Sequence, residues 1–141
     1  LLYRSGAGLT PRPLRRIASG GELSRVMLAS KVVLGNADGV DTLVFDEVDA
    51  GVGGSTARAL AAVLADLAAT HQVIVVTHLA QVAVMADKHY VVSKEPGDVP
   101  QTHLDEVTGE ARTAEIARML SGDQSEASLA HAKQMLDEAR G

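Results

Sequence analysis

Residues 42–47 read Thr42-Leu43-Val44-Phe45-Asp46-Glu47, a short apolar run closed by two acids. The run lacks polar alternation, which is typical of a strand buried on both faces of a parallel sheet. A second all-apolar run occupies residues 73–76, and a helical apolar stripe lies between the two runs. A strand, a helix and a second strand in this order predict a right-handed parallel crossover and therefore an α/β fold.

Helices and a hairpin are expected around this unit. We predict an amphipathic helix over residues 21–35 and a later helix capped by Ser55. The apolar stripe of the first helix is formed by Leu23, Val26, Met27, Val33 and Leu34. The other expected elements are strands at 1–4, 90–93 and 101–107, a short helix at 79–86, and helices at 111–120 and 125–139, the last two separated by Gly122. The fold class is thus α/β, with a parallel sheet flanked by helices and an antiparallel hairpin at its edge.

Composition narrows the classes of function. The chain has 141 residues, 46% hydrophobic residues, no cysteine and a formal net charge of -5. This length supports one ordinary core, so we expect a single compact unit. The negative charge argues against a surface that grips nucleic acid over the whole domain, and the lack of cysteine excludes disulfides and thiolate metal sites. No apolar run approaches the roughly 20 residues of a membrane span, so a cytoplasmic protein is expected.

One local surplus of positive charge lies near the start of the sequence. Its members are Arg4, Arg12, Arg15, Arg16 and Arg25, with only Glu22 opposing them. Two interpretations are open for this cluster. The arginines form a solvated face or serve as intramolecular partners for acids, or they contact nucleotide or DNA.

The segment Ser19-Gly20-Gly21-Glu22 combines a helix start with two glycines. Ser19 followed three residues later by Glu22 is a capping box, and glycines let another backbone approach the first turn. The unpaired N–H groups and the dipole of such a turn favour an anion. The alternative is an ordinary capped helix without a ligand.

Asp46 and Glu47 follow the first strand, and His78 follows the second. Side chains at the carboxyl ends of parallel strands face the crevice where α/β folds bind ligands. Neighbouring strand residues point to opposite faces, so we expect one acid to hold Mg²⁺ and the other to orient and deprotonate a water. His78 could hydrogen-bond a phosphate oxygen or the same water. The alternatives are solvated turn acids and a structural histidine.

Three motifs in one order resemble those of ABC ATPases. Ser-Gly-Gly-Glu at 19–22 resembles the signature motif, the run at 42–47 a Walker B strand, and Val-Ile-Val-Val-Thr-His at 73–78 the switch-histidine strand. The extensions after Ser19, Phe45 and Thr77 are most similar to the RecN-type, SMC-like family, and the resemblance covers nearly the whole chain. A transporter subunit would more typically carry Gln at position 22 and a different loop at 48–51.

The resemblance implies a role for each motif position in a P-loop NTPase head of the ABC type. In the signature turn, Ser19 and Gly21 would contact the γ-phosphate of ATP, Gly20 would allow its approach, and Glu22 would support the turn. After the first strand, Asp46 would hold Mg²⁺, Glu47 would polarise water, and Asp49 would lie in the D-loop at the dimer interface. After the second strand, His78 would sense the γ-phosphate. The family acts in DNA double-strand break repair and recombination, with ATP sandwiched between two heads. A nucleoid-associated location follows.

The lysine-bearing phosphate loop of such enzymes is missing from the sequence. No G-x-x-x-x-G-K-[ST] pattern occurs, and Gly6-Ala7-Gly8 leads into Thr10 and prolines. We therefore expect residues 1–141 to be the C-terminal half of a head, inactive alone and completed by an N-terminal Walker A half beyond a coiled coil. Further expected partners are a second head and DNA, and no membrane. The rivals are a nonhydrolytic dimerisation or interaction module and an ABC transporter subunit.

Overall fold

A computed structural model describes residues 2–4, 7–8, 10–13, 19–35, 39–95 and 101–139. The chain divides into two compact units, Leu1–Thr77 and His78–Gly141. The expectation of a single compact unit is therefore wrong. The parallel strand pair and the antiparallel hairpin near the C-terminus belong to different units and share no hydrogen-bonded ladder within the described residues. Each unit instead packs its own helices.

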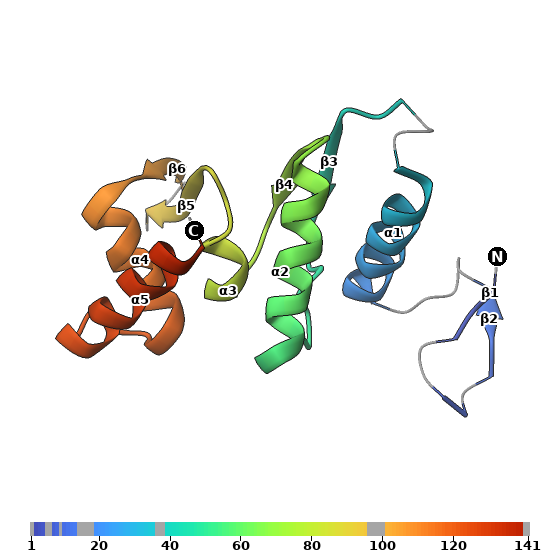
Figure 1. Ribbon diagram of the computed structural model, residues 1–141, viewed down its shortest axis with the longest axis horizontal. Helices are drawn as coiled ribbons and strands as arrows, with labels where there is room; N and C mark the ends of the chain where they lie inside the picture. Colours follow the sequence, from blue (N-terminus) through green and yellow to red (C-terminus); the bar gives the residue numbers. More distant parts are fainter. Residues whose placement is uncertain are drawn as a thin grey trace. The chain divides into compact units, whose positions relative to one another are not determined.

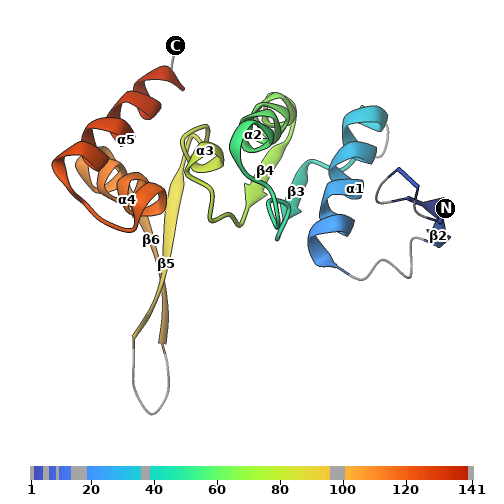
Figure 2. The same ribbon diagram turned by 90° about the horizontal axis from the view of Figure 1, so that it is seen from below.

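The first unit contains the predicted strand-helix-strand arrangement. Its elements are β1 (Leu2–Tyr3), β2 (Arg12–Pro13), α1 (Gly20–Leu34), β3 (Thr42–Phe45), α2 (Gly54–Ala68) and β4 (Gln72–Val75). β3 and β4 pair in parallel, from Thr42 opposite Gln72 to Phe45 opposite Val75. The N–H of Val76 donates to the carbonyl of Phe45 at 2.9 Å, so the pairing continues past β4. Figures 1 and 2 show α2 lying along this pair.

Both helices of the first unit begin at glycines. Ser19 caps α1 as predicted, because its side chain accepts a hydrogen bond from the N–H of Glu22 at 3.2 Å. The predicted cap Ser55 is wrong. Gly53 is the N-cap of α2, no side chain caps this helix, and Gly54 begins it at φ 56°. Glycine tolerates this left-handed backbone, so α2 starts two residues earlier than a cap at Ser55 would allow.

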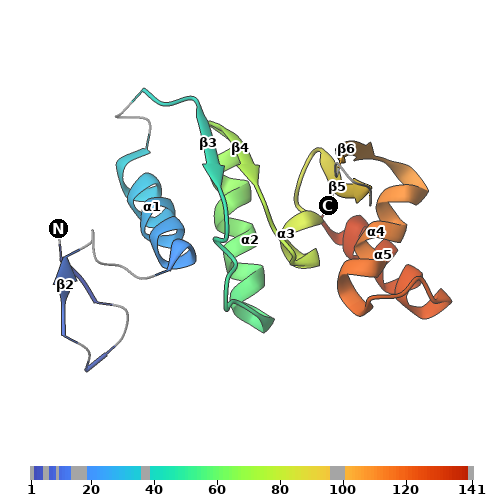
Figure 3. The ribbon, with the colours of Figure 1, turned by 180° about the vertical axis from the view of Figure 1, so that it is seen from behind.

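One apolar face of the first unit is uncovered, contrary to two predictions. Val44 is 60% exposed, and Ile74 and Val76 are exposed too, so β3 and β4 are not buried on both faces. The predicted stripe of α1 is also largely exposed, and the buried positions of this helix are Gly21, Leu28 and Lys31. The reason is that α2 can bury only one face of a two-stranded sheet. A groove of about 320 Å³ separates α1 from β3, and Figure 3 shows these elements from behind.

The second unit contains the hairpin and the last helices. Its elements are α3 (Ala80–Ala83), β5 (His89–Glu95), β6 (Gln101–Val107), α4 (Gly109–Ser121) and α5 (Glu126–Glu138). The antiparallel hairpin is confirmed, but in the described residues it forms a sheet of its own and not the edge of the parallel pair. The helix expected at 79–86 has four residues. Gly122, in the left-handed conformation at φ 77°, ends α4.

A small core holds the second unit together. It comprises Ala80, Ala83, Val84, Ile116, Ala117, Ala132 and Leu136. The buried Arg112 of α4 donates to the carbonyls of Ala83, Val84 and Ala86, which closes the C-terminal end of α3. Throughout the part of the chain that the structure describes, no helix is long and apolar enough to cross a membrane.

Candidate functional site

The start of α1 lies directly against the loop that follows β3. A Cβ added at Gly21 would lie 2.7 Å from the carbonyl oxygen of Glu47 and 2.8 Å from Cβ of Ala50. A Cβ added at Gly20 would lie 2.5 Å from Oε2 of Glu47. At position 21 only glycine permits this approach, because the Glu47 carbonyl belongs to the backbone, whereas at position 20 the neighbour is the flexible end of the Glu47 side chain. The structure thus brings the predicted signature turn, residues 19–22, next to the predicted pair of acids within one unit.

We call residues 46–51 the acid loop. Asp46 and Glu47 are both exposed, and the turn is closed by hydrogen bonds from Ala50 N–H to the Glu47 carbonyl at 3.0 Å and from Val52 N–H to the Asp49 carbonyl at 2.9 Å. Glu47 has φ 55°, the left-handed region that an L-residue with a side chain rarely adopts. The expected alternation of strand side chains therefore does not apply to the acids, because β3 ends at Phe45.

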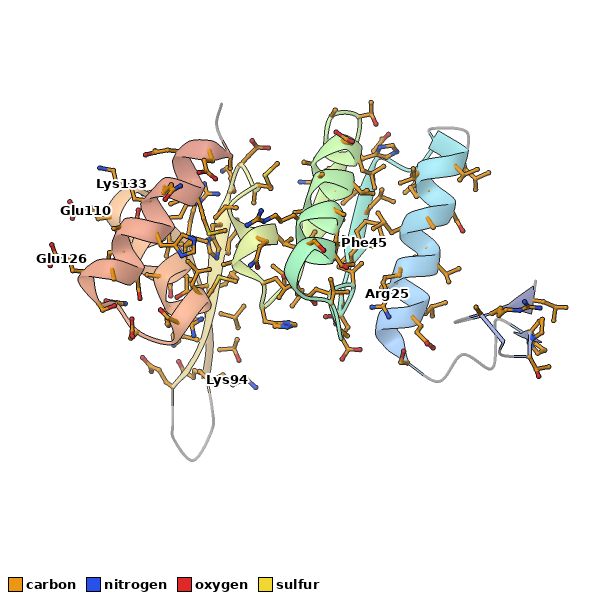
Figure 4. All side chains as sticks on the ribbon, turned by 60° about the horizontal axis from the view of Figure 1, so that its bottom comes forward. Arg25, Phe45, Lys94, Glu110, Glu126 and Lys133 are labelled. Atoms are coloured by element: carbon orange, nitrogen blue, oxygen red, sulfur yellow. The ribbon has the colours of Figure 1, made fainter. Side chains whose placement is uncertain are left out.

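Two consecutive residues of α1 hold the acid loop. The hydroxyl of Ser24 donates to the carbonyl of Asp46 at 2.5 Å. Nη1 of Arg25 donates to the carbonyls of Val48 at 3.2 Å and Ala50 at 2.9 Å. Figure 4 labels Arg25 on α1. This arginine thus has partners in its own chain, but they are backbone carbonyls and not the acids that were expected.

Sequence reasoning did not single out Ser24 and Arg25 as site residues. Their bonds span 22 to 25 residues of chain, so no local pattern reveals them. The available signal was their place two and three residues after Glu22 on the same helix. Of the other clustered arginines, Arg15 and Arg16 lie outside the described residues.

Asp49 and His78 have different surroundings. Asp49 is 2% exposed, and its carboxylate accepts a hydrogen bond from the hydroxyl of Thr77. This bond ties the acid loop to the residue that follows β4 and Val76, so the carboxylate has a partner in its own chain. Its assignment to a dimer interface stays a prediction.

His78 is exposed and is the first residue of the second unit. Its role as a phosphate sensor also stays a prediction.

The described residues lack a clustered set of metal ligands. They contain no group of three or more His, Cys, Asp or Glu side chains that could hold one. Mg²⁺ does not require such a group, because it retains waters and commonly takes one or two carboxylates together with phosphate oxygens. The exposed carboxylate of Asp46, at the end of a parallel strand, fits that kind of ligand.

Known proteins align with nearly the whole chain. The DNA repair protein RecN of Treponema pallidum is 53% identical over 137 residues, which are 96% of this chain and 24% of the relative. RecN of Deinococcus radiodurans gives the same identity and coverage. RecN of Mycobacterium tuberculosis is 51% identical over 138 residues. By sequence, the chain belongs to the RecN family. It spans about a quarter of the length of these RecN relatives.

A solved structure gives independent support for the fold. It comes from work on ATP-driven dimerization and DNA-stimulated activation of SMC ATPases. The match covers 96% of this chain and 69% of the solved chain, with a TM-score of 0.52 and 21% sequence identity. The RecN segment therefore has a mixed α/β fold like that of an SMC ATPase head. No model of a known protein family matches the chain.

Proposed function

We propose that this RecN segment is the C-terminal half of an ATPase head that binds ATP between two heads and hydrolyses it during DNA double-strand break repair and recombination. The main support is the packing of the signature turn against the acid loop, where a Cβ at Gly21 would meet the Glu47 carbonyl at 2.7 Å. This packing places an anion-favouring helix start and two exposed carboxylates in one unit. The RecN relatives supply the link to DNA repair.

In this proposal the signature turn recognises phosphate. Ser19 and Gly21 contact the γ-phosphate of ATP held by the second head, and Gly20 leaves room for it. Glu22 supports the turn, since its N–H is already engaged by Ser19. The N-terminal dipole of a 15-residue helix adds partial positive charge at this point.

The acid loop and His78 supply the remaining groups. Asp46 holds Mg²⁺, which supplies charge neutralisation on the phosphates when it is bound. Glu47 orients the attacking water and accepts its proton. Asp49 keeps the D-loop in place at the head interface, and His78 donates a hydrogen bond to the γ-phosphate.

The proposed partners follow from what this segment lacks. A triphosphate needs the lysine of a phosphate loop, so an N-terminal Walker A half must complete the head. The uncovered apolar face, with the exposed Val44, Ile74 and Met27, is where we place that half, because burying apolar area stabilises the contact. A second head contributes the other ATP site. DNA is bound by the full assembly, in the cytoplasm at the nucleoid.

The catalytic assignment is tested by Glu47→Gln in the full-length protein. We expect ATP hydrolysis to be lost while ATP binding remains, and head dimers to accumulate, because the amide cannot accept the proton from water. Glu110→Gln, an equal change at an exposed position of α4, is the matched control and should leave turnover at the parental rate. Unchanged turnover of Glu47→Gln would remove this residue from its role.

The phosphate-binding assignment is tested at Ser19. Ser19→Arg fills the phosphate position and should prevent the trapped dimer in the Glu47→Gln background. Ser19→Ala removes the hydroxyl but leaves the space open, so it should weaken the dimer less.

The isolated 141-residue chain should show no ATPase activity. Turnover by this chain alone would contradict the division of labour with a Walker A half, and a stable dimer without ATP would favour a nonhydrolytic module.

A further inference from the structure

Arg25 makes an unusual connection between α1 and the acid loop. One nitrogen of its guanidinium donates to two carbonyls that lie on either side of Asp49, at 3.2 Å to Val48 and 2.9 Å to Ala50. A guanidinium is charged at every physiological pH, and its hydrogen bonds to carbonyls are stronger than neutral ones. The side chain is half-buried, so solvent competes less for these bonds.

The loop that Arg25 holds includes the strained residue Glu47. A non-glycine residue at φ 55° persists only where surrounding contacts determine its conformation. Arg25 supplies two such contacts on the C-terminal side of Glu47, and Ser24 supplies one on its N-terminal side through the Asp46 carbonyl. Both residues lie one helical turn beyond the signature turn. The conformation of Glu47 is thus supported by hydrogen bonds from the helix that carries the signature turn.

We propose that Arg25 is a positioning residue that ties the placement of Glu47 to the position of the signature helix. This inference rests on the proposed function and deepens it. The signature turn would serve the ATP of the partner head, whereas Glu47 would serve the ATP of its own head. A movement of α1 when phosphate binds at one site is therefore passed by Arg25 to the water-activating carboxylate at the other. Arg25 itself touches no nucleotide in this scheme.

The test compares Arg25→Gln, Arg25→Lys and Arg58→Gln in the full-length protein. Arg58 is an exposed arginine of α2, so its replacement removes the same charge without touching the loop. Arg25→Gln should lower kcat by at least tenfold, because a misplacement of about 1 Å in a catalytic group costs up to about a hundredfold. KM for ATP should change less than about twofold, since the phosphate contacts remain. Arg25→Lys should restore part of kcat, and Arg58→Gln should match the parent.

A second readout separates positioning from damage to the fold. In the Glu47→Gln background, Arg25→Gln should still form the ATP-dependent head dimer. Where Arg25→Gln does not fold, Ser24→Ala takes its place and should lower kcat about fivefold, the effect of one hydrogen bond of ordinary strength. An unchanged kcat in the folded variant would overturn the inference. So would a raised KM with kcat retained, which would make Arg25 a nucleotide contact.

The outcomes also separate this inference from the proposed function. An inactive Glu47→Gln with a fully active Arg25→Gln would refute positioning by Arg25 and leave the ATPase assignment intact. A fully active Glu47→Gln would refute both.

Discussion

Replacing Gly21 by alanine tests whether the signature turn and the acid loop are packed as closely as described. The added Cβ would meet the Glu47 carbonyl oxygen at 2.7 Å and Cβ of Ala50 at 2.8 Å. Both atoms are fixed to the backbone, so neither can rotate away. The carbonyl would have to withdraw by about 0.7 Å to reach the 3.4 Å of ordinary van der Waals contact. Such a movement would strain the bonds from Ser24 and Arg25 to the same loop.

The size of the effect follows from two opposing terms. Overpacking of this kind lowers the free energy of unfolding by about 1–3 kcal/mol, and replacing glycine by alanine in a helix raises it by up to about 1 kcal/mol. We expect Gly21→Ala to destabilise the first unit by about 1–2 kcal/mol. Gly20→Ala is the matched control. Its Cβ meets the carboxylate of Glu47, the far end of a flexible side chain, so this variant should be neutral or slightly more stable.

Amide hydrogen exchange in α1 and β3 is the appropriate assay, because it reads the opening free energy of the first unit separately from the second. The free energies of the two variants should differ by about 2 kcal/mol. Values that agree within about 0.5 kcal/mol would show that the turn does not pack against the backbone of the acid loop.

Two further predictions concern the strained acid and a turn in the second unit. Glu47→Gly should be more stable than Glu47→Ala by about 1 kcal/mol in the same exchange assay, because alanine resists φ 55°; an equal or higher stability of the alanine variant would contradict the strain. Hydrogen bonds lower the pKa of Asp123 below its ordinary 3.8, with the bond from Ser128 contributing most and those from Ser125 next. The ionised carboxylate therefore stabilises the fold above about pH 3.8, and this stabilisation is lost as pH falls through the lower pKa of the folded state. By NMR titration Ser128→Ala should raise that pKa more than Ser121→Ala does, and a pKa unmoved by Ser128→Ala would exclude the assigned cause.

Local sequence signals predicted the elements well. The limits of β3 were predicted to the residue, because one threonine and three apolar residues stand between Asp41 and Asp46. The cap at Ser19 and the break at Gly122 follow from the chemistry of one residue each. These features depend on neighbours within a few positions, which is the range that a sequence pattern reports.

Features that depend on distant residues were missed or misjudged. The exposure of Val44 depends on which element covers the second face of β3. An apolar strand sequence does not reveal whether that covering element belongs to the same chain. The left-handed backbone of Glu47 has no signal, since the residue is not glycine. The partners of Arg25 are carbonyls, which every residue has. The candidate site could thus be predicted as a set of residues but not as a connected arrangement.

The uncovered strand pair has a consequence for handling this segment. Within the described residues β3 and β4 pair only with each other, so each has an outer edge of backbone donors and acceptors beside exposed apolar side chains. Open edges of this kind template the addition of strands from other copies. We therefore expect concentrated preparations of the 141-residue chain to form β-rich aggregates, and we expect co-expression with the proposed Walker A half to keep it dispersed.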